Sequence, residues 1–119
     1  VEIQNIGDEP VVDDFWVDVY INPATPPTSV NDTLETLNAY GFVWGITDVV
    51  IHPGGTLQLT LNDAYFVETE HTAPFPLSAG YPVYAQVDSA NANNPNGAIL
   101  EDHEKSGSTY NNITMSAIQ

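Results

Sequence analysis

Short runs in which apolar and polar side chains alternate constrain the fold most strongly. In "FWVDVYI", residues 15–21, every second side chain is apolar, and "TLQLTL" and "PVYAQVD" repeat the pattern. Successive side chains of a strand point to opposite faces, so this period predicts β-strands with one face against a core. Stretches rich in Pro and Gly, such as "NPATPPT" and "HPGG", separate the runs. We therefore expect many short antiparallel strands.

The number and spacing of the runs predict a single all-β domain over residues 1–119. We expect strands at approximately 1–6, 15–21, 41–51 in two pieces, 56–62, 64–68, 82–88, 97–101 and 111–118. Seven or eight short strands with regular turns favour an immunoglobulin-like antiparallel β-sandwich. In "VNDTLETLNAYG" the spacing of Leu34 and Leu37 also permits one turn of helix, capped by Asn31 or Asp32.

The run at 15–21 predicts two different faces. One carries Phe15, Val17, Val19 and Ile21 and is expected to face the core, together with Leu57, Leu59, Val83 and Val87 of other strands. The other carries Trp16, Asp18 and Tyr20, and the carboxylate of Asp18 predicts that this face is at least partly in water.

The charge balance excludes several classes of partner. The chain has 16 Asp and Glu against one Lys or Arg, for a formal net charge of -15. Binding to nucleic acid needs basic side chains that displace counterions, so a nucleic-acid partner is excluded. No apolar run reaches the roughly 18 residues of a membrane span, and membrane insertion is not expected. There is no Cys, so disulfides and thiolate metal sites are excluded.

Catalytic patterns are not found. The three histidines, His52, His71 and His103, are scattered, and no Gly-x-Ser-x-Gly turn or phosphate-binding loop is present. Paired carboxylates occur in stretches that read as turns, where no cleft is expected. We therefore expect a protein that is not an enzyme.

Calcium is the cofactor that the polar loops could bind. The ion takes about six to eight oxygen ligands, usually gathered on a loop. The stretch "DSANANNPNG" and the residues that follow it offer such oxygens without the spacing of an EF-hand. The candidate ligands are Asp88, Asn91, Asn93, Asn96, Glu101 and Asp102. The Asn residues also suit turns that need no ion.

Aromatic side chains suggest glycans as alternative ligands. Trp16, Tyr20 and Trp44 could form a flat platform on which a sugar stacks, although packing within the sandwich explains large aromatics equally well. Asn31 and Asn112 lie in N-x-[ST] triplets and are glycan acceptors in a secretory setting.

Three motifs in order resemble one family. "NIGDEPVVDDFWVDVYI", "HPGGTLQLTL" and "VYAQVDSANANNPNGAILEDHEKSGSTYNNIT" are similar to the opening, the Pro-Gly turn and the closing pattern of CARDB domains, the cell-adhesion-related domains of bacteria. The resemblance implies a seven-stranded sandwich related to immunoglobulin and fibronectin type III domains. It also implies a role as an adhesive or spacer repeat in a secreted or surface protein.

The chain departs from this family pattern in two places. Segment 24–51 is longer than the usual connection, and the strand that precedes the N-x-G turn strand in the family is missing. The chain begins inside an apparent strand, so we expect a piece of a longer product. A sandwich without its first strand leaves backbone groups unpaired, and either the tail "NNITMSAIQ" of the same chain or a strand of a neighbouring copy could fill the gap. The expected junction residues are Val1, Ile3, Ile113, Met115 and Ile118.

The sequence thus predicts a non-catalytic structural or adhesion module at the surface of a bacterial or archaeal cell. It would be a repeat unit or filament subunit whose partners are neighbouring copies or domains. The alternative is a surface module that binds calcium or carbohydrate.

Overall fold

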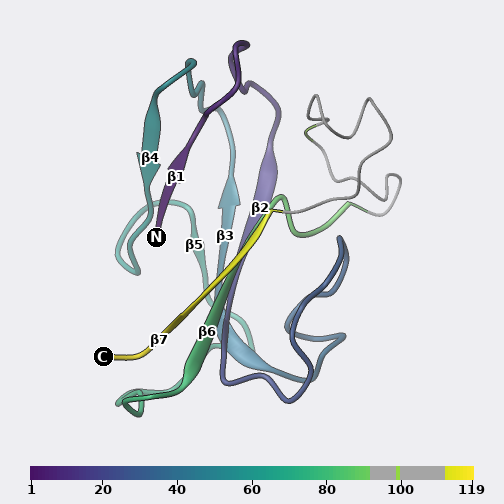
Figure 1. The fold of residues 1–119 in the computed structure, drawn as a ribbon, viewed down its shortest axis with the longest axis vertical. Coiled ribbons are helices and arrows are strands. Elements are labelled where there is room, and N and C mark those ends of the chain that lie inside the picture. Colours follow the sequence, from purple (N-terminus) through teal and green to yellow (C-terminus); the bar gives the residue numbers. More distant parts are fainter. Residues whose placement is uncertain (92–98, 100–111) are drawn as a thin grey trace.

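The chain forms seven strands and no helix within the residues that the structure, a computed structural model, describes: 1–91, 99 and 112–119 (Figure 1). The strands are β1 (Glu2–Gln4), β2 (Phe15–Ile21), β3 (Tyr40–Ile46), β4 (Thr56–Gln58), β5 (Phe66–Val67), β6 (Pro82–Val87) and β7 (Ile113–Ala117). The all-β prediction is confirmed, and β2 has the predicted bounds. Of the strand predicted at 97–101, only Ile99 belongs to the described residues.

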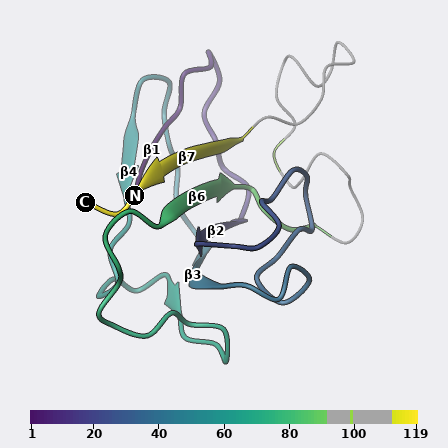
Figure 2. The same ribbon diagram turned by 60° about the horizontal axis from the view of Figure 1, so that its bottom comes forward.

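The strands make two antiparallel sheets. One has two strands in the order β1-β4, and the other has five in the order β5-β3-β2-β6-β7. Figure 2 shows β7, β6, β2 and β3 side by side in the larger sheet. β2 lies at its centre, where Val17 is paired with Trp44 of β3 and with Val87 of β6. Two sheets with a shared core agree with the predicted β-sandwich.

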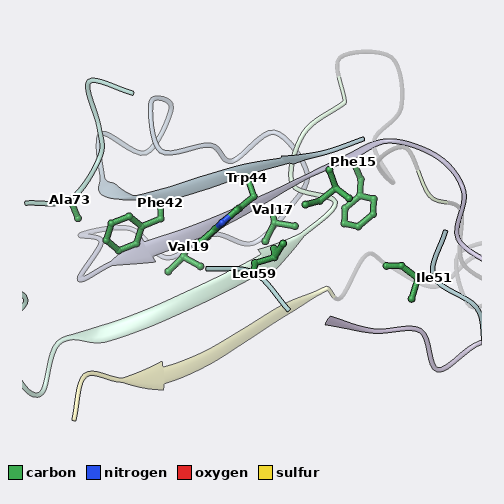
Figure 3. Packing of buried hydrophobic residues seen from close by; sticks show 9 residues of the cluster. Phe15, Val17, Val19, Phe42, Trp44, Ile51, Leu59 and Ala73 are labelled. Atoms are coloured by element: carbon green, nitrogen blue, oxygen red, sulfur yellow. The ribbon is translucent and has the colours of Figure 1, made fainter. Parts of the chain in front are cut away.

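The apolar core lies between the two sheets, and Figure 3 shows its residues. Val17 has no exposed surface, and complete burial of a valine side chain contributes about 1.5–3 kcal/mol to folding. Ile3 of β1 and Leu57 of β4 pack against the buried residues from the smaller sheet. The buried members are Phe15, Val17, Val19, Phe42, Trp44, Ile46, Ile51, Leu59 and Ala73. The core-facing side predicted for β2 is therefore confirmed.

The opposite face of the large sheet, which we call the outer face, is covered by segment 22–39. This segment connects β2 to β3, and its Leu34 and Ala39 form a second buried cluster with Tyr20. Asp18 is 3% exposed and Tyr20 is 0% exposed, whereas Trp16 is 43% exposed. The predicted wet face is thus wrong for Asp18 and Tyr20, because the long connection folds back over them.

Segment 22–39 makes turns where the sequence permitted a helical turn. Leu37 N donates to the Thr33 carbonyl over 3.0 Å, as in a helix, but the pattern does not continue. Asn31 and Asn38, on either side, have positive φ values of 72° and 50°. Such values interrupt a right-handed helix, and Asn adopts them more readily than most residues.

Candidate functional site

A cleft of about 260 Å³ opens on the outer face. Three parts of the chain line it: β2 and β3, the covering segment 22–39, and the turn after β5. The lining residues are Trp16, Asp18, Thr33, Leu34, Glu35, Val43, Thr69, Glu70 and His71. Sequence reasoning singled out only Trp16 and Asp18 of this group for a role on this face. The others are far apart in the sequence, and no local motif signals their meeting.

Trp16 owes its position to a glycine on the neighbouring strand. Trp16 and Gly45 are paired between β2 and β3, so their side-chain positions face the same side of the sheet. A Cβ added to Gly45 would lie 3.1 Å from Cζ3 of Trp16. The indole therefore lies over the glycine, half exposed at the edge of the cleft.

Asp18 is the most buried carboxylate of the cleft. Its Oδ1 accepts a hydrogen bond of 2.8 Å from the Ser89 hydroxyl. Burial raises the pKa of Asp18, and the hydrogen bond from Ser89 opposes this shift in part. Asp18 is paired with Val43 of β3, so these two residues form the base of the cleft on the sheet.

Glu35 and Glu70 supply two further carboxylates, one from segment 22–39 and one from the turn after β5. Both residues are exposed, and neither carboxylate has a hydrogen-bond or ion-pair partner within the described part of the chain. His71, next to Glu70, differs from them: its Nδ1 is buried and has no hydrogen-bond partner. The His71 ring lies 6.0 Å from the ring of Tyr40, centroid to centroid. The lining is thus acidic, with one imidazole whose buried nitrogen is unsatisfied.

A buried polar network fastens segment 22–39 to the sheet and so fixes one wall of the cleft. The Tyr20 hydroxyl donates to Gln86 Oε1 over 2.5 Å and also contacts the Asp32 carbonyl. Gln86, which is 0% exposed, donates through Nε2 to the Ser29 carbonyl over 2.7 Å. Asn31 adds a second attachment: its side-chain amide and the backbone of Asn91 exchange two hydrogen bonds of 2.9 Å.

The carbohydrate platform predicted from Trp16, Tyr20 and Trp44 is wrong. Tyr20 and Trp44 are buried on opposite faces of the sheet, and Trp44 Nε1 donates to the Thr60 carbonyl over 2.9 Å. Trp44 is paired with Val17 and shares its core-facing side, whereas Trp16 and Tyr20 face the other side, so these rings cannot form one surface. Trp16 alone remains available to a ligand.

The predicted calcium ligands are only partly within the described residues. Asp88 is 1% exposed and its Oδ2 accepts from Ile99 N over 2.9 Å, while Asn91 is paired with Asn31. Asn93, Asn96, Glu101 and Asp102 lie outside the described residues. Within 1–91, 99 and 112–119, no group of three or more His, Asp or Glu side chains is arranged to hold a metal ion. Calcium binding by the whole loop stays a prediction.

The other predicted positions fall on the two sheets and on segment 22–39. Val1 and Ile3 belong to the β1 region, and Ile113 and Met115 to β7, followed by Ile118. Of the two predicted glycan acceptors, Asn31 uses its side chain to hold residue 91. Asn112 precedes β7 and accepts a backbone hydrogen bond from Val87 N.

Comparison with models of protein families, with curated proteins and with solved structures finds no match. In the described part of the chain, no helix has the length and hydropathy of a membrane span.

Proposed function

We propose that the chain is a non-catalytic structural module of a bacterial or archaeal surface protein, joined to its neighbours by β-strand pairing. The observation that carries the proposal is the open edge of β1. The strand that pairs with this edge comes from a neighbouring copy or an adjoining domain. Adhesion and an extracellular location belong to the same proposal, and both rest on the resemblance in sequence to CARDB domains.

The free edge of β1 supports this proposal in its backbone pattern. Val1 exchanges hydrogen bonds with Leu59, and Asn5 N donates to the Gly55 carbonyl. The backbone N–H and C=O groups of the odd-numbered residues therefore point to β4. In an antiparallel ladder the alternate residues direct their N–H and C=O groups to the other side. Those residues are Glu2 and Gln4, and within the described residues β1 has no second partner strand. The edge is thus ready to accept an added strand.

The unequal size of the two sheets also supports the proposed addition of a strand beside β1. Two strands face five, and Val83 and Ala85 of β6 are only partly buried although they pack against the core. Thr114 and Ser116 of β7 are paired with Ala85 and Val83, so they share that inner face, and both are exposed. A strand added beside β1 would extend the smaller sheet over this part of the inner face.

The strand order is compatible with a fibronectin type III or immunoglobulin-like sandwich that lacks its first strand. In such folds the first strand adds to the edge of the smaller sheet that β1 occupies here. The tail does not fill this place, because residues 113–117 pair with β6 as β7. Ile113 and Met115 are paired with Gln86 and Tyr84, on the outer face. We therefore place the proposed junction along β1, where Glu2 and Gln4 have the free backbone groups next to Val1 and Ile3, with Ile113 and Met115 outside it.

The experiment compares two proline variants in the same sheet. In Gln4→Pro the substitution removes an N–H that points away from β4, so it blocks the edge without breaking the β1-β4 ladder. Gln58→Pro is the matched control: Gln58 is paired with Glu2 in the ladder, and its N–H points away from β1 on the other side. We expect the unmodified chain to self-associate with concentration in sedimentation velocity, and Gln58→Pro to do the same.

Gln4→Pro should remain monomeric at every concentration while its circular dichroism spectrum stays unchanged. Association of Gln4→Pro equal to that of the control would contradict pairing at β1. An unmodified chain that stays monomeric, with all its β1 amide protons protected from exchange, would contradict the open edge itself.

A further inference from the structure

The polar groups of the outer-face cleft are mostly hydrogen-bond acceptors. Asp18, Glu35 and Glu70 contribute carboxyl groups, which are acceptors without a donor when they are ionised. Thr33 and Thr69 add hydroxyls. The chain has a single basic residue of the Lys or Arg type, Lys105, and it lies outside the described residues. Within the described residues no ion pair neutralises the cleft carboxylates.

Two observations beyond the carboxylates point to a ligand. The first is the hollow itself, of about 260 Å³, with apolar walls from Leu34 and Val43 and the half-exposed indole of Trp16. The second is the buried Nδ1 of His71, which has no hydrogen-bond partner. A buried polar atom without a partner is unfavourable, and it belongs to a residue that lines this hollow.

We propose that this cleft binds a small organic cation, namely an alkylammonium or guanidinium group such as the end of a basic side chain. Such groups are donors only and match a lining of acceptors. The carboxylates of Glu35 and Glu70 balance the positive charge, and the face of Trp16 attracts it through the ring quadrupole. Leu34 and Val43 contact the alkyl stem, whose apolar surface is thereby removed from water.

Other ligand chemistries match the lining less well. A calcium ion needs a shell of oxygens, and the described residues have no cluster of ligands that could hold a metal ion. A sugar hydroxyl needs donors as well as acceptors, and the three ionised carboxylates of this lining can only accept. Each copy of this chain has one Lys and no Arg, so a separate basic molecule is the richer source of such groups.

The test is an NMR titration that follows the indole N–H of Trp16, assigned with Trp16→Phe. The probes are n-butylammonium, n-butylguanidinium and N-acetyl-lysine amide, which separate a free amine from a basic side chain in a peptide. The comparison ligands are n-butanol, methyl α-glucoside and calcium chloride. We expect the three cations to bind saturably, at least about fivefold more tightly than n-butanol, since two exposed ion pairs together reach roughly this factor.

Variants identify the groups that carry the binding. Glu70→Gln and Glu35→Gln should each lower the affinity for n-butylammonium about twofold to threefold, and Trp16→Leu should lower it by a similar factor. Glu2→Gln, on the other sheet, removes the same charge far from the cleft and should change affinity less than about 1.5-fold. All four positions are exposed or half exposed, so the variants should keep the fold, which circular dichroism verifies.

Three results would overturn the proposal. Equal binding of n-butanol and n-butylammonium would mean that the cleft selects apolar groups without regard to charge. An equal effect of Glu2→Gln and Glu70→Gln would assign the binding to net charge alone. A response to methyl α-glucoside or calcium with none to the cations would assign the cleft to a different ligand.

Discussion

Replacing Tyr20 by Phe tests how segment 22–39, the cover over the outer face, is held in place. Tyr20 has no exposed surface, and its hydroxyl contacts two acceptors, the buried Gln86 Oε1 at 2.5 Å and the partly buried Asp32 carbonyl. Gln86 cannot turn its amide to compensate, because Nε2 already donates to the Ser29 carbonyl. Removal of the hydroxyl proton leaves one buried acceptor without its donor, which costs about 1–3 kcal/mol.

We therefore expect Tyr20→Phe to lower the free energy of unfolding by about 2 kcal/mol in a urea titration, with an unchanged m-value. In a chain of 119 residues this corresponds to a fall in Tm of about 6–10 °C. Tyr84→Phe is the matched control. Tyr84 is paired directly with Tyr20 on the same face, but it is partly exposed and its hydroxyl makes no hydrogen bond to the described residues.

Tyr84→Phe should change stability by less than about 0.5 kcal/mol. Equal losses in the two variants would refute the reasoning, because the effect would then follow from a tyrosine on this face and not from the buried acceptors. A loss below about 0.5 kcal/mol in Tyr20→Phe would show that the cover does not depend on this network.

Two further predictions concern the sheet beneath the cover. Gly41→Ala should prevent accumulation of folded protein, because the added Cβ would lie 1.7 Å from the Val19 carbonyl oxygen. Gly45→Ala should remain folded, because its added Cβ meets only the movable Trp16 ring at 3.1 Å. Soluble yield and circular dichroism measure both variants. The pKa of Asp18 is raised on folding, so its contribution to stability is present below about pH 4 and is lost as the pH rises through the raised value. In urea titrations from pH 3 to 7, Asp18→Asn should therefore gain stability relative to the unmodified chain as the pH rises, and a constant difference would contradict the assignment.

The strand core was predictable because it depends on a local pattern. In β2 the apolar side chains at every second position fix which face meets the core, and Phe15, Val17 and Val19 are buried as the alternation requires. The turn residues located the ends of the strands approximately. The weaker predictions were the short edge strands, such as β5, whose two residues pair only because β3 lies beside them.

The cleft was not predictable in this way. Glu35 lies in the stretch that permitted a helical turn, and Glu70 and His71 lie in a stretch without a motif. They meet at β2 only because segment 22–39 and the turn after β5 converge on one face of the sheet. The alternation in β2 also suggested that Asp18 is in water. A strand pattern specifies which side chains share a face, but it does not specify what later covers that face.

The sequence by itself therefore determined the fold class and the inward face of the central strand, because the two-residue period is a property of every extended chain. Only the tertiary structure decided that Tyr20 and Asp18 are buried, that Trp16 lies over Gly45, and that three separated carboxylates line one cleft. The burial of Tyr20 and Asp18 depends on where a long connection packs, and its position follows from hydrogen bonds between residues as far apart as Ser29 and Gln86.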